Sequence, residues 1–496
     1  MLRFPRFSRS RTPQDPLSYP LFKWSRQDSF TLRDSFSGAI IMGATGSGKT
    51  TGSGKIFAKS MLEYGYGGLV LTAKSDEIDT WIEYAKETNR AGDLILFGPG
   101  ARQSFNFLDY EMAREGNGAG LTMNVVSLLS TVLEVAERNS GSGGTGDESY
   151  WVRANRQLMR NVVDLIALAK GRISVPDLYR VVISAPTSSA QVRSDAWKKS
   201  STCFRWLMEA DKREMSPSER ADFEIVADFW LIEFPNLSEK TRSVITSSFT
   251  SMIDVLNRGV LRDLFCKETT LTPDAIEQGK IILVCMPVKE FGEAGLFAQI
   301  LWKYAFQKSI ERRDLSKSDR PVFLWADEAQ NFLTSYDMEF LTTCRAARVA
   351  TVFLTQNYSN FVAALGGGEK SRVETDSILA NLNIKILHAN GDPVTNEWAS
   401  GLIGRSLEFF INGGTSRPSI DQTPMFQLML GLQSDATEST GFSTSYEFEV
   451  QPKEFTQLRT GGPDNKMIVE GIVFQNGKTF TATDKTWMQV RFNQKI

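Results

Sequence analysis

The chain has 496 residues, which is too long for one hydrophobic core and indicates two or three domains. Its formal net charge of −2 excludes binding to nucleic acid through overall charge, so any DNA-binding surface must be local. Four cysteines without Cys-x-x-Cys spacing and a single histidine argue against a zinc site or a disulfide framework, and favour a reducing cytoplasm.

Residues 1–36 are predicted to be a basic N-terminal arm. They carry Arg3, Arg6, Arg9 and Arg11 and lack the apolar region of a signal peptide. Such a segment is either a solvated terminus or an arm that contacts phosphates or a partner. No later stretch reaches the roughly 18 continuous apolar residues that span a bilayer.

A phosphate-loop motif follows the apolar run 39–42. The motif is Gly43-Ala44-Thr45-Gly46-Ser47-Gly48-Lys49-Thr50. Glycines let successive backbone N–H groups turn toward phosphate oxygens, while Lys49 reaches the β and γ phosphates and Thr50 offers a hydroxyl to Mg²⁺. A chance match to a glycine-rich turn is the alternative, but the strand in front argues against it. The motif predicts a site for ATP and Mg²⁺.

Short β-rich runs alternate with helical stretches from residue 37, which predicts an α/β fold with a mostly parallel central sheet. The strands are expected at 39–42, 68–72, 93–97, 280–285, 321–326, 350–354 and 384–388. The nucleotide-binding domain therefore comprises residues 37–114 and 242–405, and the alternation breaks between them.

Residues 115–241 show helical periodicity and are predicted to be an inserted all-α domain around a flexible tract at 140–146. Two apolar stripes support this: Trp151, Leu158, Val162, Leu165 and Leu168 on one, and Phe223, Val226, Phe229 and Ile232 on the other. Arg153, Arg156 and Arg160 form a basic stripe, which is either a solvated helix face or a DNA contact.

An apolar strand that ends in Asp327-Glu328 has the form of a Walker B element. Asp327 is expected to hold Mg²⁺ through water, and Glu328 to polarise the attacking water. Gln356 follows the next strand and is the candidate γ-phosphate sensor, with a strand-end cap as the alternative. Arg345 and Arg348 are candidates for an arginine finger, or for structural ion pairs.

The rest of the chain divides into two segments. Residues 406–450 are rich in Gly, Ser and Thr and are expected to be irregular. Residues 451–496 are expected to form a β-hairpin that completes the core, with strands at 467–474 and 479–490 and a turn at Asn476-Gly477.

Taken together, these motifs resemble the coupling-protein ATPases of conjugation and type IV secretion, the TraG/TraD type within the FtsK/HerA branch of RecA-like motors. Lys74-Ser75-Asp76-Glu77 is similar to the family's Lys-Gly-Glu segment, with Ser75 where glycine is usual. The segment 104–109 is similar to its Phe-Asn-Pro-Leu signature, with Phe107 in place of proline. Cys344 and Arg348 stand where the family's Gly-Arg-x-x-Gly has glycines.

The resemblance implies a RecA-like P-loop domain, ATP hydrolysis, and a homo-oligomeric ring of six copies with DNA, single- or double-stranded, in its channel. It also implies that relaxase, accessory or effector proteins bind the all-α domain. Family members usually carry an N-terminal transmembrane pair, for which the 36 preceding residues leave no room. We therefore expect a soluble cytoplasmic member, or one held at the inner membrane by a channel partner.

Three other functions fit the same motifs. The first is a soluble hexameric motor of a DNA-processing or defence complex. The second is an effector-recruiting ATPase for protein export without DNA threading. A small-molecule kinase is the weakest alternative, because such kinases rarely carry an Asp-Glu Walker B element and need no large helical insert.

Overall fold

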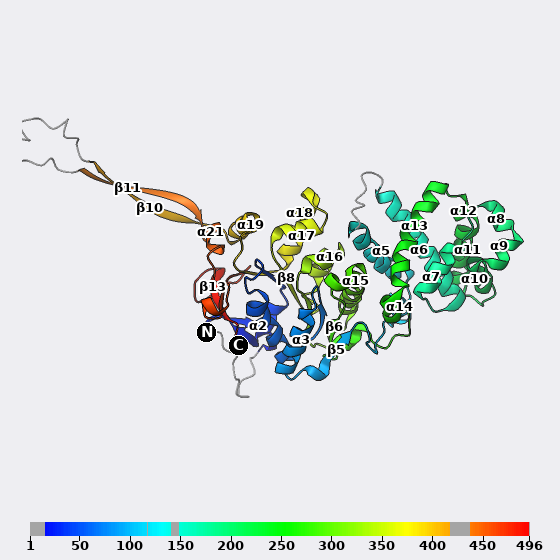
Figure 1. The fold of residues 1–496 in the computed structure, drawn as a ribbon, viewed down its shortest axis with the longest axis horizontal. Helices are drawn as coiled ribbons and strands as arrows, with labels where there is room; N and C mark the ends of the chain where they lie inside the picture. Colours follow the sequence, from blue (N-terminus) through cyan, green and yellow to red (C-terminus); the bar gives the residue numbers. More distant parts are fainter. Residues whose placement is uncertain (1–14, 117, 140–147, 417–436, 496) are drawn as a thin grey trace, which may run out of the picture.

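The computed structural model describes residues 15–116, 118–139, 148–416 and 437–495. Its body is a nine-stranded sheet flanked by helices, with a helical domain at one end and a two-stranded arm at the other (Figure 1). The four arginines of the N-terminal segment and the tract 140–146 lie outside the described residues. In the described part of the chain, every helix falls short of the length and apolar character needed to cross a membrane.

The central sheet has the strand order β13-β12-β9-β3-β8-β7-β4-β6-β5. All seven strands from β9 to β5 run parallel, and β12 and β13 are antiparallel at the edge next to β9. The bounds are β3 Ala39–Met42, β4 Gly67–Leu71, β5 Leu94–Phe97, β6 Ile281–Val284, β7 Val322–Ala326, β8 Val349–Thr355, β9 Ile384–Leu387, β12 Ile468–Gln475 and β13 Trp487–Asn493. The seven predicted parallel strands are thus confirmed.

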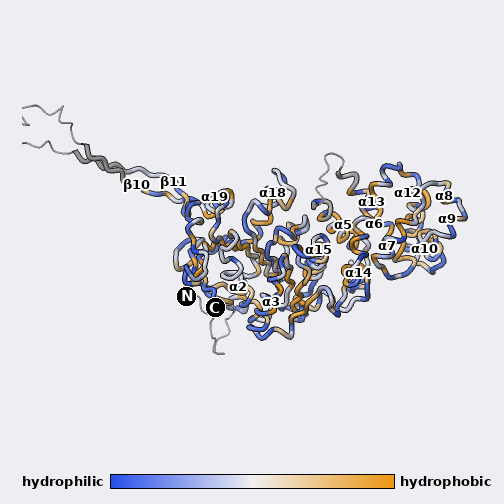
Figure 2. Tube along the Cα trace, viewed as in Figure 1, coloured by the Kyte–Doolittle hydropathy of each residue, from blue (hydrophilic) through white to orange (hydrophobic). Residues whose placement is uncertain are grey.

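Both faces of the sheet are covered, which explains why its strands are apolar throughout. Ile40 packs into the hydrophobic cluster that contains α15, and its neighbour Ile41 packs into the cluster on the opposite face with α2 and α3. The hydropathy colouring shows this apolar layer running through the body (Figure 2). The helices of the body are α1 Leu32–Ser35, α2 Lys55–Tyr64, α3 Asp76–Glu87, α15 Val288–Arg312, α16 Tyr336–Thr343, α17 Tyr358–Ala364, α18 Gly368–Asn381, α19 Pro393–Ile403 and α21 Pro452–Phe455.

The described N-terminal residues belong to the body, contrary to the prediction of an arm through residue 36. Strands β1 Pro20–Lys23 and β2 Ser29–Thr31 form a small sheet, and Phe22, Trp24 and Phe30 are buried against Phe57 of α2. Burial of these aromatic rings outweighs the polar composition around them, which had suggested a solvated segment.

The helical domain is confirmed as an insertion after β5. Its helices are α4 Phe107–Ala113, α5 Thr122–Asn139, α6 Glu148–Lys170, α7 Val175–Ile183, α8 Ser189–Arg193, α9 Asp195–Ser200, α10 Thr202–Asp211, α11 Pro217–Asp228, α12 Phe234–Asn236, α13 Glu239–Leu256 and α14 Gly259–Phe265. Hydrogen bonds from Phe105 N–H to Leu264 O (2.7 Å) and from Thr270 N–H to Ser104 O (2.9 Å) close its base. The helices therefore extend beyond the predicted limits of 115 and 241.

The second apolar stripe of this domain is only partly correct. Phe223, Val226 and Phe229 are buried, but Ile232 is 56% exposed. A π-helical turn at Phe229–Glu233 changes the rotation per residue, so a residue three positions after Phe229 no longer shares its face.

The segment 406–450 contains strands, so the prediction that it is irregular is wrong for its described part. β10 Arg405–Ser416 pairs with β11 Thr437–Phe448 in one antiparallel register of twelve residue pairs. The alternation of polar and apolar residues in Ser406-Leu407-Glu408-Phe409 is a strand pattern, which the Gly, Ser and Thr content of the segment obscured. The two C-terminal strands pair antiparallel as predicted, but the prediction of a tight connection at Asn476-Gly477 is wrong: residues 476–486 connect β12 to β13, which begins at Trp487 and not at 479.

Candidate active site

The phosphate loop lies at the carboxyl end of β3, between the ends of two neighbouring parallel strands. Gly43 N–H donates to Thr355 O of β8 at 3.3 Å, and Ala44 N–H donates to Ala389 O beyond β9 at 2.9 Å. After the loop, a helical turn at Thr50–Gly54 leads into α2. Parallel sheets place ligands at such carboxyl ends, so the loop opens where a nucleotide is expected.

The loop has the conformation and the free groups that a phosphate requires. Gly46 and Gly48 have φ angles of 77° and 80°, which favour glycine. Among the described residues, the backbone N–H groups of Gly46, Gly48 and Lys49 have no acceptor. The hydroxyl of Ser47 is buried and also lacks a partner within this part of the chain. An unpaired buried hydroxyl carries a free-energy cost that a phosphate oxygen would remove, and the free N–H groups of the loop would donate to the same phosphate, so the loop fits a nucleotide phosphate.

The C-terminal hairpin supports this loop, a role that sequence reasoning missed. A Cβ atom on Gly48 would come within 2.4 Å of Val469 Cγ2 and 3.1 Å of Thr460 O. Gln494 donates to Thr51 Oγ1 at 2.6 Å. A cavity of about 160 Å³ opens beside the loop, and it is lined by Ala44, Thr45, Ser47, Ala389, Asn390, Gly391, Thr456 and Thr460.

His388 connects the start of α2 to the hairpin. Its Nδ1 lies 2.8 Å from Glu470 O and its Nε2 lies 2.7 Å from Ser53 Oγ. A carbonyl only accepts, so Nδ1 carries the proton and Nε2 accepts from the serine hydroxyl. Burial lowers the pKa of His388 to about 4, which keeps the ring neutral.

The two Walker elements meet although 277 residues separate them. Thr50 Oγ1 donates to Asp327 Oδ2 at 2.9 Å. Asp327 is buried, and burial raises its pKa, against the opposing charge of Lys49 and the hydrogen bond from Thr50. A hydroxyl and a carboxylate side by side are oxygen ligands that suit Mg²⁺, which prefers such groups together with phosphate oxygens. The residues present therefore fit a magnesium nucleotide.

Glu328 occupies a strained position that directs its carboxylate to the phosphate loop. Its φ and ψ are 49° and 48°, a left-handed conformation uncommon for a residue other than glycine. Its carboxylate accepts from Lys74 Nζ at 2.9 Å and from Gln330 Nε2 at 2.9 Å, and Lys49 Nζ lies 3.9 Å away. Gln356 Nε2 also contacts it, at 3.4 Å.

These neighbours decide the charge of Glu328. Burial acts to raise its pKa, but hydrogen bonds from Gln330 and Lys74, together with the charges of Lys49 and Lys74, outweigh burial and lower the pKa to about 2. The carboxylate is therefore ionised at neutral pH, as a group that orients or deprotonates water must be.

Two further titratable residues lie near the site: Lys74 of the loop between β4 and α3, and Glu77 in the first turn of α3. Glu77 is buried, and its Oε2 accepts from Ala73 N–H at 2.8 Å. Burial and the nearby charge of Asp327 raise the pKa of Glu77 to about 8. The Lys-Ser-Asp-Glu segment contained a signal for both residues, but nothing in the sequence showed that they approach Walker B.

The two arginines lie before the amino end of β8, whereas the phosphate loop lies at the carboxyl end of the neighbouring parallel strand β3. Arg348 comes just before β8, whose seven residues span roughly 20 Å at about 3.3 Å per residue. Arg348 pairs with Asp319 at 2.8 Å. Arg345 is exposed, its backbone carbonyl accepts from Arg348 N–H at 3.1 Å, and within the described residues its side chain has no hydrogen-bond or ion-pair partner. The structure does not bring either arginine to the Lys49 of its own chain.

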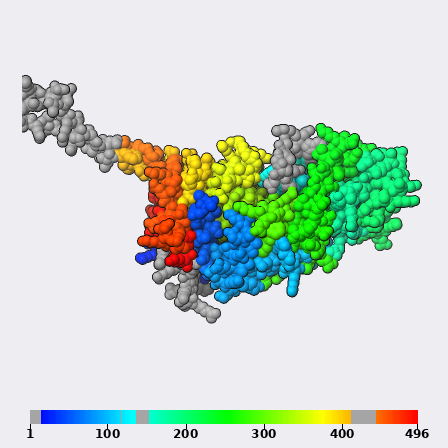
Figure 3. Space-filling view, viewed as in Figure 1, coloured from blue at the N-terminus to red at the C-terminus, as the bar shows by residue number. Residues whose placement is uncertain are grey.

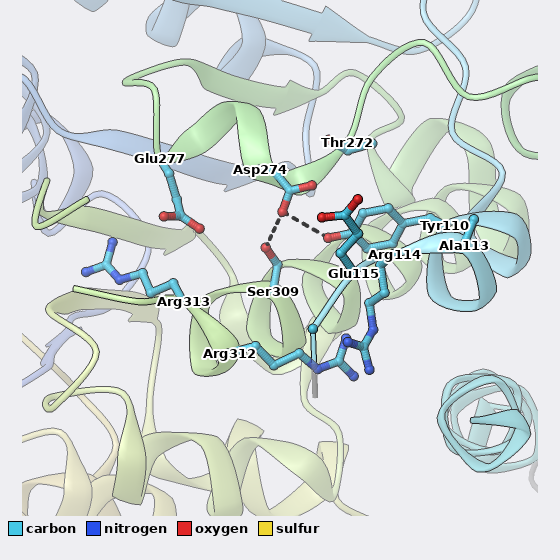
Figure 4. A pocket seen from close by; sticks show the side chains of 11 residues that line it. Tyr110, Ala113, Arg114, Glu115, Thr272, Asp274, Glu277, Ser309, Arg312 and Arg313 are labelled. Carbon is cyan, nitrogen blue, oxygen red and sulfur yellow. Dashed lines mark hydrogen bonds between the residues drawn. The ribbon is translucent and has the colours of Figure 1, made fainter. Parts of the chain in front are cut away.

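A larger cavity of about 670 Å³ lies between α4, α15 and the loop after the helical domain (Figure 4). In it, Tyr110 and Ser309 donate to Asp274 Oδ1 at 3.0 and 3.1 Å. Arg312 is held by Glu111 at 2.9 Å. Arg313, which also lines the cavity, donates to the backbone carbonyls of Arg320 and Ala347. The candidate hydrolytic residues lie with the phosphate loop and not in this cavity.

Comparisons with known proteins agree with this arrangement. Residues 321–417 match the family model described as "TraM recognition site of TraD and TraG". No curated protein matches the chain. Among solved structures, the bacterial conjugative coupling protein TrwBdeltaN70 in its unbound monoclinic form is 15% identical, with a TM-score of 0.59 over 93% of this chain and 86% of that chain.

Two other TrwB structures give similar values. The trigonal form in complex with sulphate has a TM-score of 0.60 at 15% identity, over 93% of this chain and 86% of that chain. The plasmid coupling protein TrwB in complex with ADP and Mg²⁺ has a TM-score of 0.54 at 15% identity, over 94% and 87%. At this identity the likeness shows the fold. The predicted resemblance to the TraG/TraD-type coupling-protein ATPases is thus confirmed, by the family model over residues 321–417 and by the RecA-like fold with its all-α insert over most of the chain.

Proposed function

We propose that this chain is an ATP-driven motor that moves DNA or nucleoprotein and delivers it to a secretion or conjugative transfer channel. The observation that carries the proposal is the contact of Thr50 with Asp327 beside an ionised Glu328, because it completes a hydrolytic site from both Walker elements. TrwB, which shares the fold, has been solved with an ATP analogue and with ADP and Mg²⁺.

Each residue of the site has a role that its position supports. Lys49 and the loop N–H groups would hold the β and γ phosphates, and Thr50 and Asp327, which lie side by side, would hold Mg²⁺. Mg²⁺, when bound, neutralises charge on the β and γ phosphates. Glu328 orients and deprotonates the attacking water. Gln356 senses the γ phosphate next to Glu328. Its backbone carbonyl accepts a hydrogen bond from Asn390 Nδ2 at 2.8 Å, which holds it in place.

The position of Arg345 favours a ring. A cation on the γ phosphate accelerates phosphoryl transfer, and a neighbouring subunit often supplies it. Arg345 lies across the sheet from its own loop, so it can serve only the site of another copy. Head-to-tail contacts of this kind close into rings, and we propose six copies around a DNA channel.

Recruitment is the remaining part of the proposal. The all-α domain presents the exposed Arg153, Arg156 and Arg160 and is proposed to receive relaxase, effector or accessory proteins, or DNA. The match to a TraM recognition model over residues 321–417 supports a second contact with an accessory protein, through exposed residues of that segment. In this role the chain works in the cytoplasm, against a channel partner at the inner membrane.

The decisive experiment measures ATP turnover of the wild type, Lys49→Ala and Glu328→Gln, each with and without DNA over a series of salt concentrations. We expect DNA to raise wild-type turnover, the rise to fall steeply with salt because phosphate contacts dominate, and both variants to be inactive. Turnover that persists in both variants would refute the site. Turnover indifferent to DNA would favour the effector-recruiting ATPase.

A further inference from the structure

The β10–β11 arm has two faces of different character. In the observed register Leu407 lies opposite Tyr446, and Phe409 lies two residues further along the same face. Leu407 is 46% exposed, Phe409 71% and Tyr446 66%. The other face carries the pairs Ser406–Glu447 and Glu408–Ser445, and beyond them Phe410, 42% exposed, lies opposite Ser443. The face of Leu407, Phe409 and Tyr446 is therefore the more apolar face of the ribbon, and it is uncovered.

The body does not cover this face. The arm projects away from the molecule beyond α19 and α21 (Figures 1 and 3). Its described contacts with the body lie at its base, where Glu449 N–H donates to Gly404 O at 3.1 Å. A two-stranded ribbon is at best marginally stable in water by itself, so exposed rings along it favour a partner that covers them.

The base of the arm lies beside the nucleotide cavity. The chain enters the arm from Asn390 and Gly391 through α19, and leaves it through α21 to Thr456. These residues line the cavity beside the phosphate loop. Asn390 N–H also donates to Phe455 O at 3.3 Å, which ties the two segments together. The arm is thus inserted between two walls of the nucleotide site.

We propose that the apolar face of the arm docks on a second copy of this chain, the copy that supplies Arg345 to the adjacent nucleotide site. This inference rests on the proposed function, which requires a neighbour at the open side of the phosphate loop, where the arm begins. The charge of the arm does not suit DNA: its described side chains include Glu408 and Glu447 and one cation, Arg405, which stacks on Phe448.

The area of the apolar face of the arm limits how much it can contribute to binding between subunits. Three side chains of this kind bury about 500 Å² at most, less than the roughly 800 Å² per partner of a standard interface. The arm therefore strengthens a subunit contact that other surfaces begin, and its loss weakens the assembly without unfolding the subunit.

The test compares the two faces by mass measurement in solution, with Mg²⁺ and an unhydrolysed ATP analogue. The apolar-face variant carries Leu407→Ser, Phe409→Ser and Tyr446→Ser, and the matched control carries Ser406→Ala and Glu408→Gln. We expect the apolar-face variant to need at least tenfold more protein to assemble, with an unchanged melting temperature. The control is expected to assemble like the wild type.

A photo-crosslinking amino acid at position 409 provides an independent readout. It should join two copies covalently, and the same group at position 408 should not. Equal assembly of both variants, or a wild type that stays monomeric under all these conditions, would overturn the inference. ATP turnover of the same samples distinguishes failure of this inference from failure of the proposed function. A monomer that still hydrolyses ATP through Lys49 and Glu328 retains the proposed hydrolytic site, although its arm does not dock on a second copy.

Discussion

Lys74 of the β4–α3 loop donates to the carboxylate of Glu328 at 2.9 Å, closer than Lys49 at 3.9 Å. When Lys49 engages phosphate, Lys74 is the cation that stays on the catalytic carboxylate. The β4–α3 loop, not the phosphate loop, therefore fixes where Glu328 points.

Replacing Lys74 with Gln should lower the turnover number about tenfold to a hundredfold, because a hydrogen bond to a charged group contributes about 1.5–3 kcal/mol. The KM for ATP should change little, since Lys74 touches Glu328 and not the phosphate loop. Steady-state kinetics checks both values. Lys74→Arg, which keeps the charge, should recover most of the activity, and an equal loss in Arg and Gln would contradict a role in holding Glu328.

Arg345→Ala should leave nucleotide binding intact and lower turnover by about a thousandfold, as for other arginine fingers. Mixing Arg345→Ala with Lys49→Ala subunits should restore part of the activity, because an intact loop in one copy then meets an intact arginine in the next. Arg348→Ala is the control, since Arg348 pairs with Asp319 at the surface and should matter by less than about 1 kcal/mol. Absence of rescue on mixing would place the finger elsewhere.

Gly48→Ala and Gly46→Ala form a matched pair in the phosphate loop. Both glycines have positive φ angles, but a Cβ on Gly48 meets Val469, whereas a Cβ on Gly46 meets nothing within 4 Å. Gly46→Ala should cost about 1 kcal/mol of backbone strain, and Gly48→Ala should lower the melting temperature further and abolish ADP binding. Calorimetry checks both, and Val469→Ala should partly rescue Gly48→Ala. Identical effects of the two single variants would exclude the hairpin contact.

We expect the buried Lys385 of β9 to make the stability of the protein depend on pH. It is buried, and burial lowers its pKa to about 8, below its unfolded value of 10.5. The unfolded chain therefore binds more protons between these values, so stability rises as pH increases from about 8 to 10.5 and carries the full penalty below pH 8.

Lys385→Met should remove that penalty and stabilise the protein at pH 7 by about 3 kcal/mol. Denaturant unfolding at pH 7 and pH 9.5 measures the effect, which should shrink at the higher pH. The exposed Lys370→Met serves as control and should change stability by less than about 0.5 kcal/mol. A Lys385→Met variant no more stable than wild type would show that the ammonium reaches water.

Much of the fold was predictable because its signals are local. Each of the seven parallel strands is a short apolar run, since burial on both faces removes polar residues from it. The phosphate loop and Asp327-Glu328 were recognisable for a related reason, because their chemistry needs particular residue types at fixed spacing. Such signals do not depend on what packs against them.

Sequence by itself thus determined a P-loop site, its two acidic residues and a helical insert between strands. Only the tertiary structure decided that Lys74 and Glu77 flank Walker B, that Val469 and Thr460 support the phosphate loop, and that Arg345 lies across the sheet from Lys49. These relations join residues far apart in the chain, and strand order in the sheet, which no local pattern encodes, sets the distance between them.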